Sequence, residues 1–183
     1  RDIQVLCPMY RGDAGADAIN QDLQSLLNPG APEMERSGRR YREGDKVMQI
    51  KNDYEKDLFN GDTGRITRLP RGGGDMRVRF GNRELEYPIT GLDALIPAYA
   101  ITVHRAQGSE YPAVLMPLTT EHFMMLRRNL LYTGITRGQR LVVLVGSHKA
   151  LAMAVRNNEE ARRFSGLGER LRGLLEDRRP QNE

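Results

Sequence analysis

The sequence has a single cysteine and no long hydrophobic run. One cysteine, Cys7, excludes an internal disulfide and a zinc site built from several cysteines, and it favours a reducing compartment. No apolar stretch approaches the roughly 20 residues of a membrane-spanning helix. We therefore predict a cytoplasmic protein with no membrane partner. The chain also begins with Arg1 rather than Met and enters an apolar stretch at once, so we expect a segment of a longer protein.

Neither sign of charge dominates. Lys and Arg total 28 and Asp and Glu total 24, which gives a net charge of +4. An excess of this size permits a polyanionic partner such as nucleic acid but does not identify one. With 39% hydrophobic residues among 183, the chain can form one globular domain or one domain with a small insert.

Most of the chain has the hydrophobic pattern of an α/β fold. Short apolar runs predict strands that could share one parallel sheet at 3–7, 98–103, 113–118 and 141–145. Apolar positions three and four residues apart predict helices at 16–27, 127–136 and 147–156. In the first helix the predicted apolar face includes Leu23, Leu26 and Leu27. Strands and helices in this order indicate a sheet covered by helices.

Residues 36–97 have a different pattern. Their short alternating segments, separated by glycine-rich turns, predict a small antiparallel β-barrel with strands at 46–51, 63–69, 76–80 and 84–87. We therefore divide the chain into an α/β domain (1–35 and 98–165), a barrel insert (36–97) and a charged C-terminal tail (166–183). Within the barrel, Lys51 and Tyr54 are candidates for binding single strands through a cation and a ring. A solvated lysine and a tyrosine packed on the barrel are the alternatives.

The densest polar stretch follows the predicted strand at 98–103. It contains Thr102, His104, Arg105, Gln107, Ser109 and Glu110. Sites in α/β sheets lie beyond strand ends, and Gly108 lets the backbone approach a ligand. The stretch therefore suits contact with a phosphate or nucleotide, and a satisfied polar turn is an equally good interpretation of its composition.

A second polar stretch ends at Arg137. Tyr132, Thr133, Thr136 and Arg137 are about one helical turn apart, so Arg137 could project from a helix end toward a neighbouring surface. The fixed fork of N–H donors on arginine matches phosphate oxygens and stabilises charge on a transferring phosphoryl group. A solvated surface arginine is the commoner case.

Taken together in this order, the segments resemble the last motifs of superfamily 1 DNA helicases, in particular the RecD-like branch. Residues 8–12, followed by Gly15 and Asn20, resemble motif IV; residues 102–110 resemble motif V; and residues 132–137 resemble motif VI. Segments 44–49, 52–54 and 60–64 resemble the Src-homology-3-like barrel inserted in the second motor domain of this family. The resemblance implies a RecA-like (P-loop NTPase-type) parallel sheet with helices, interrupted by that barrel, in an ATP-dependent helicase that moves 5′ to 3′ on DNA.

The resemblance also implies roles for individual residues. Two arginines would be catalytic contacts to the ATP phosphates: Arg137, as the arginine finger, and Arg11. Three residues would face the nucleotide: Gln107, Gly108 and Glu110. Five residues would contact single-stranded DNA: Thr102, His104, Arg105, Lys51 and Tyr54.

The sequence contains no G-x-x-x-x-G-K-[ST] segment and no Gly-Lys pair. Nothing in it can cradle the β- and γ-phosphates, so the chain alone is not expected to hydrolyse ATP. ATP and Mg²⁺ would be bound mainly by the first RecA-like motor domain of the same polypeptide, and we expect no metal site here. Two alternatives remain: a non-catalytic nucleic-acid-binding module on a motor fold, or the helicase part of a conjugative relaxase or recombination nuclease complex.

Overall fold

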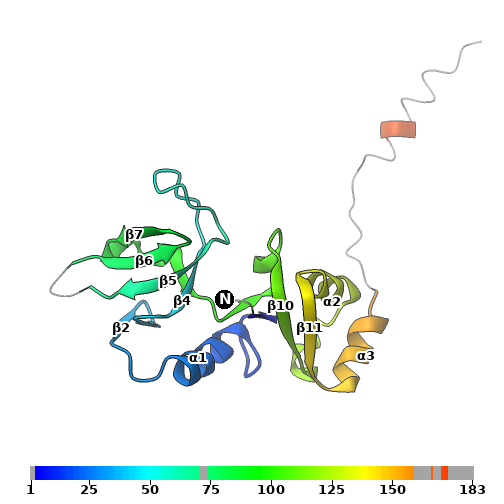
Figure 1. Ribbon diagram of the computed structural model, residues 1–183. Coiled ribbons are helices and arrows are strands. Elements are labelled where there is room, and N and C mark those ends of the chain that lie inside the picture. Colours follow the sequence, from blue (N-terminus) through cyan, green and yellow to red (C-terminus); the bar gives the residue numbers. More distant parts are fainter. Residues whose placement is uncertain (1–2, 71–73, 159–165, 167–169, 173–183) are drawn as a thin grey trace, which may run out of the picture.

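The computed structural model describes residues 3–70, 74–158, 166 and 170–172. These residues form a four-stranded parallel sheet, a five-stranded antiparallel sheet and a two-stranded hairpin. Figure 1 shows the antiparallel strands on one side and β10, β11, α2 and α3 on the other. The predicted class, a parallel α/β sheet with an antiparallel insert, is confirmed. The predicted tail at 166–183 lies almost entirely outside the described residues.

The parallel sheet has the strand order β11-β10-β1-β9. Its strands are β1 (Ile3–Cys7), β9 (Ala100–Thr102), β10 (Tyr111–Leu118) and β11 (Gly138–Gly146). The last of these is an edge strand with much exposed apolar surface, since Leu141 is 55% exposed and Val143, Leu144 and Val145 are also exposed. The predicted strand at 98–103 is shorter in the structure, because Ala98 and Tyr99 form the crossing between two sheets.

Helices cover both faces of this sheet: α1 (Ala16–Leu27) on one, and α2 (Arg128–Ile135) and α3 (His148–Arg156) on the other. Side chains of a strand alternate between faces. Val5 and Cys7 accordingly pack in a cluster with Ala16 of α1, whereas Leu6 packs in the cluster that contains residues of α2 and α3.

The predicted apolar face of α1 is partly wrong. Leu26 is 75% exposed and Leu27 is exposed as well, whereas two amides of the helix, Asn20 and Gln24, are buried. The spacing rule counts apolar residues and cannot register an amide that is buried because it has backbone partners. The helix therefore faces the interior with a polar side that the sequence pattern does not indicate.

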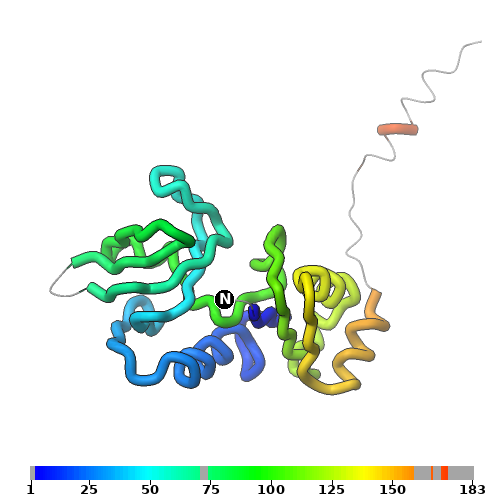
Figure 2. Tube along the Cα trace, viewed as in Figure 1, coloured from blue at the N-terminus to red at the C-terminus, as the bar shows by residue number. Residues whose placement is uncertain are grey.

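The insert forms the five-stranded sheet, in the order β7-β6-β5-β4-β8. Its strands are β4 (Lys46–Gln49), β5 (Thr63–Arg68), β6 (Met76–Phe80), β7 (Arg83–Tyr87) and β8 (Leu95–Pro97), with a short 3₁₀ helix, η1 (Ile89–Ala94), before β8. Figure 2 shows the chain entering this part after the blue α1 and returning in green to the parallel sheet.

A hairpin of β2 (Glu33–Arg36) and β3 (Arg39–Arg42) precedes the insert strands and was not predicted. Its sequence is almost entirely charged and polar, so it lacks the alternation by which a strand is found. Tyr41 is its one fully buried side chain, and the tyrosine hydroxyl donates to the carbonyl oxygen of Leu95 at 3.0 Å. That contact fixes the hairpin to β8.

Two buried amides anchor the crossing between the sheets. The Nε2 of Gln4, in β1, donates to the carbonyl oxygens of Ala98 at 3.2 Å and Tyr99 at 3.1 Å. Asn20, in α1, exchanges two bonds with the backbone of Ala100: its Nδ2 donates to the carbonyl at 2.7 Å and its Oδ1 accepts from the N–H at 2.9 Å. The amides therefore fix where the chain returns from the insert to the parallel sheet.

A buried carboxylate joins the insert to α1. Asp45 is fully buried and accepts hydrogen bonds from the side chains of Gln24, Asn28 and Tyr99 and from the backbone N–H of Arg42. A buried carboxylate is tolerated only when its oxygens are paired in this way. The network therefore fixes α1, the hairpin and the crossing segment relative to one another.

We predict that Asn20→Ala lowers the free energy of unfolding by about 2 to 4 kcal/mol, because both backbone groups of Ala100 lose their partner while staying buried. Urea unfolding of this chain measures the loss. Gln21→Ala, one residue along the same helix and exposed, is the matched control and should change the value by less than about 0.5 kcal/mol. Equal stability of the two variants would contradict the anchoring role.

We also predict a pH-dependent stability from Lys46, whose Nζ donates to the Oε1 of Gln4 at 2.6 Å. Burial, together with the nearby charge of Arg65, lowers the pKa of Lys46 from 10.5 to about 8. Between these values Lys46 binds more protons in the unfolded chain, so its own contribution to the free energy of unfolding should rise with pH across that window, by about 1 to 3 kcal/mol, against the opposite contribution of the buried thiol of Cys7.

Lys46→Met should remove that rise, and urea unfolding at several pH values from about 7 to about 10.5 measures the slope. Lys149→Met, at an exposed position on α3, is the control and should keep the wild-type slope. The same dependence of stability on pH in Lys46→Met and in the wild type would contradict the contribution of Lys46.

Candidate functional site

Arg137 lies directly between the end of α2 and the start of β11, and its guanidinium is anchored by three oxygens. Its Nε donates to the carbonyl of Thr133 at 3.3 Å, its Nη1 to the carbonyl of Ser109 at 3.2 Å and its Nη2 to the Oγ1 of Thr136 at 3.3 Å. A cation at a helix carboxyl end is also favoured by the helix dipole. A guanidinium has further N–H donors, so this arrangement orients Arg137 while leaving it able to bind an anion.

Gly134 allows α2 to lie close to the sheet. A side chain at this position would collide with the side chain of Met116, which is fully buried in β10. Glycine here costs helix propensity, about 1 kcal/mol relative to alanine, but it lets the helix end approach β10. The approach of α2 to the sheet sets the position of Arg137.

The turn before β10 brings two more predicted residues to the end of the sheet at which Arg137 lies. Gly108 has a φ of +83°, a conformation that glycine adopts without strain, and open space surrounds it. Glu110 is exposed, and its Oε2 accepts from the Nε2 of Gln139 at 3.1 Å. Arg137, Gly108 and Glu110 therefore share the end of the sheet at which β10 and β11 begin, and we call them the Arg137 group.

Arg11 does not belong to this group. It follows the carboxyl end of β1, where neighbouring Gly12 and Asp13 lie against Glu121, just beyond the end of β10. Arg137, by contrast, precedes Gly138, which pairs with Tyr111 at the start of β10. At about 3.3 Å per residue, roughly 20 Å of strand separates the two ends. The structure does not bring Arg11 and Arg137 to one phosphate.

The polar stretch after β9 forms a short 3₁₀ helix, η2 (Val103–Ala106). The Oγ1 of Thr102 accepts from the N–H of Arg105 at 3.4 Å and caps this turn, while His104 and Arg105 are exposed. A groove of about 470 Å³ separates η2 from the insert and is lined by Ile50, Asn60, His104, Arg105 and Gln107. We call it the η2 groove; Gln107, predicted to face the nucleotide, lines it together with the residues predicted to bind DNA.

The loop between β4 and β5 presents the two candidates from the insert. Lys51 is exposed, and Tyr54 is 78% exposed with its ring edge-to-face on Phe59, the centroids 6.4 Å apart. Asn60 of the same loop lines the η2 groove. The exposed ring and the lysine thus belong to a loop that reaches the groove.

The arginines of β6 are not free cations. Arg77 pairs with Glu86 at 2.7 Å and Arg79 pairs with Glu84 at 3.2 Å across the strand pair β6–β7. Exposed pairs of this kind contribute little stability, but they neutralise the charge of that face. The face is a weaker candidate for binding a polyanion than the η2 groove.

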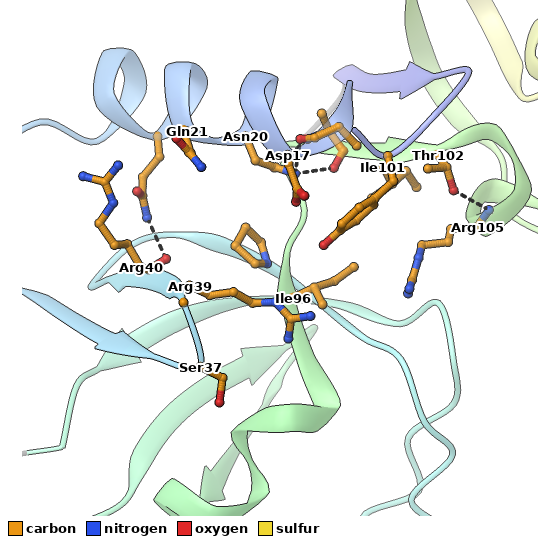
Figure 3. A pocket seen from close by; sticks show the side chains of 16 residues that line it. Asp17, Asn20, Gln21, Ser37, Arg39, Arg40, Ile96, Ile101, Thr102 and Arg105 are labelled. Carbon is orange, nitrogen blue, oxygen red and sulfur yellow. Dashed lines mark hydrogen bonds between the residues drawn. The ribbon is translucent and has the colours of Figure 1, made fainter. Parts of the chain in front are cut away.

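Sequence reasoning missed a pocket of about 270 Å³ between α1, the hairpin β2–β3 and β9, shown in Figure 3. Its lining includes Tyr10, Asp17, Arg39 and Thr102. One wall is the hairpin, so a prediction without the hairpin could not have found it.

Cys7 is buried, and burial raises the pKa of its thiol to about 12, which makes it unreactive. Within the part of the chain that the structure describes, no three His, Cys, Asp or Glu side chains are grouped to hold a metal ion. Among the same residues, no helix is long and apolar enough to cross a membrane.

Comparison with known families identifies both parts of the chain. Residues 19–80 match the model of the SH3 domain of ATP-dependent RecD-like DNA helicases, and residues 97–145 match the model of the UvrD-like helicase C-terminal domain. The first range runs from within α1 to the end of β6, and the second runs from the end of β8 into β11.

Two curated relatives cover nearly the whole chain. It is 41% identical over 170 residues to a Deinococcus radiodurans protein named ATP-dependent RecD2 DNA helicase. The aligned region covers 93% of this chain and 23% of that relative. It is 31% identical over 176 residues to the RecBCD enzyme subunit RecD of Haemophilus influenzae. That alignment covers 96% of this chain and 25% of the relative. The chain therefore spans about a quarter of the length of these relatives.

Solved structures of Pif1 helicases share the fold. A Bacteroides Pif1 helicase in complex with ADP-AlF3 and single-stranded DNA superposes with a TM-score of 0.60 at 18% identity, covering 94% of this chain and 46% of that one. A structure of two coordinating Pif1 helicases at forked DNA gives a TM-score of 0.60 at 19% identity, with 96% and 45% covered. The RecA-like fold expected from the sequence is confirmed.

We predict that Gly134→Val lowers the free energy of unfolding by about 1 to 3 kcal/mol, because the added side chain overpacks the contact with Met116. Denaturant unfolding of this chain provides the measurement. Asn129→Val, exposed on the same helix, introduces the same residue without the collision and should cost less than about 0.5 kcal/mol. If both substitutions cost the same, the contact with Met116 does not require a glycine at this position.

Proposed function

Because the chain belongs to the RecD-like DNA helicases, we propose that it is the C-terminal motor half of an ATP-dependent helicase that moves 5′ to 3′ along single-stranded DNA. The observation that supports this proposal is the position of Arg137. Its guanidinium is anchored by three oxygens at the end of the sheet where β10 and β11 begin, beside Gly108 and Glu110. That is the arrangement expected of an arginine that contributes from one domain to a phosphate bound by another.

In the proposed mechanism this chain completes a nucleotide site rather than forming one. ATP and Mg²⁺ would be held mainly by the first motor domain of the same polypeptide, which supplies the phosphate-binding loop. The remaining N–H donors of Arg137 would stabilise the negative charge on the transferring phosphoryl group. Glu110 and Gly108 would border the nucleotide from this side. Arg11 is left out of this role because it lies at the other end of the sheet.

The DNA strand would run through the η2 groove. Thr102, His104 and Arg105 would contact it from the parallel sheet, and Lys51 and Tyr54 would contribute a cation and a stacking ring from the insert. Gln107 would also contact the DNA strand rather than the nucleotide, because it lines the η2 groove.

A short covalent and hydrogen-bonded path joins the two sites. The Nη1 of Arg137 donates to the carbonyl of Ser109, only two residues after Gln107 of the groove. A movement of the Arg137 guanidinium toward a phosphate would therefore alter the turn that continues into η2. This contact gives nucleotide binding a way to change the grip on DNA.

We predict that Arg137→Ala in the full-length parent protein lowers DNA-stimulated ATP hydrolysis at least about 10³-fold, the magnitude typical of an arginine finger, while DNA affinity changes less than about twofold. Steady-state phosphate release and oligonucleotide binding measure the two quantities. Arg140→Ala, exposed on β11, is the matched control and should keep wild-type turnover.

Unimpaired turnover in Arg137→Ala would contradict the assigned role. A wild-type parent that binds DNA tightly but does not hydrolyse ATP would instead indicate a non-catalytic DNA-binding module on a motor fold.

A further inference from the structure

The pocket between α1, the hairpin β2–β3 and β9 combines an aromatic ring with several cations. Its lining includes the ring of Tyr10 and the arginines Arg39, Arg40 and Arg105, against a single carboxylate, that of Asp17. Figure 3 shows the side chains of Arg39 and Arg105 extending into the same space from β3 and from the turn after β9. The lining therefore carries a positive charge around an apolar and aromatic wall.

Hydrogen bonds hold the walls of this pocket in place. Asn20 fixes α1 to β9 through the backbone of Ala100, and the Nε2 of Gln24 donates to the carbonyl of Arg40 at 3.1 Å, which fixes α1 to the hairpin. Because these amides are buried and paired, the pocket exists before any ligand binds, and binding would cost little reorganisation.

Tyr10 lines the pocket and is 37% exposed as a residue. Burial raises the pKa of its hydroxyl, the Asp17 carboxylate raises it further and the Arg39 guanidinium lowers it. A partly exposed ring in a pocket lining is available for stacking.

The pocket shares a side chain with the proposed DNA path. Arg105 lines both this pocket and the η2 groove, and Thr102, which caps η2, lines the pocket as well. A strand lying in the groove would therefore meet a residue that also lines the pocket.

We propose that this pocket receives one nucleotide of the single strand, with its base against Tyr10 and its phosphate between Arg39 and Arg105. This inference rests on the proposed function and adds a binding site to it. A volume of about 270 Å³ is below that of pockets for drug-sized ligands, and it suits a single ring system. Stacking on a ring tolerates any base, as a motor that moves along DNA requires.

The test uses the full-length parent and two probes of equal length, an oligothymidylate and an oligomer of abasic deoxyribose phosphate. Tyr10→Ala should weaken binding of the oligothymidylate about 10-fold, within the range for loss of one stacked base, and leave binding of the abasic oligomer unchanged. Tyr10→Phe keeps the ring and should bind both probes as the wild type does. Phe123→Ala, which removes an exposed ring after β10, is the matched control.

Arg39→Gln should weaken binding of both probes. It should also reduce the slope of log affinity against log salt concentration by about 0.7, the value for one phosphate contact to a single strand. Equal losses for the two probes in Tyr10→Ala, or no loss for either, would overturn the base pocket, as would an unchanged salt slope in Arg39→Gln. These outcomes are independent of the ATP hydrolysis by which the motor function is tested, so either proposal can fail alone.

Discussion

The structure depends on how the polypeptide crosses between its two sheets. The crossing is made by two residues, Ala98 and Tyr99, and the buried amides of Gln4 and Asn20 hold it by bonds to its backbone. Buried amides are stable only when paired, so one register of β9 against β1 satisfies them and others do not. The place of η2, the orientation of the insert and the walls of the Tyr10 pocket all follow from that register.

Sequence patterns predicted the fold class because apolar runs and their spacing distinguish strands from helices, even where the apolar residues are exposed, as in β11. The bounds of α1 were predicted correctly, but its buried side was not, because Asn20 and Gln24 are buried by hydrogen bonding rather than by hydrophobicity. The hairpin β2–β3 was missed since its residues are charged and exposed. Nor could a pattern show that Arg77 and Arg79 have acidic partners, because cross-strand neighbours are set by register.

The candidate site shows the same limit. Motif resemblance assigned both Arg11 and Arg137 to the ATP phosphates and grouped Gln107 with the residues that face the nucleotide. In the structure, the chain after Thr102 turns back along the sheet through η2. Residues a few positions apart therefore lie at opposite ends of the strands. Gln107 lines the groove, whereas Glu110 lies with Arg137 at the start of β10 and β11. Separation along a strand, rather than separation in sequence, decides which side chains meet.

The apolar edge strand β11 governs how this chain behaves when it is handled alone. Among the described strands it pairs only with β10, and Leu141, Val143, Leu144 and Val145 are open to solvent. An open, apolar strand edge is a template for pairing with another chain. Production of the chain by itself would therefore be limited by aggregation through β11 rather than by the stability of its cores. Longer versions that cover this edge would stay dispersed at concentrations where the isolated chain precipitates.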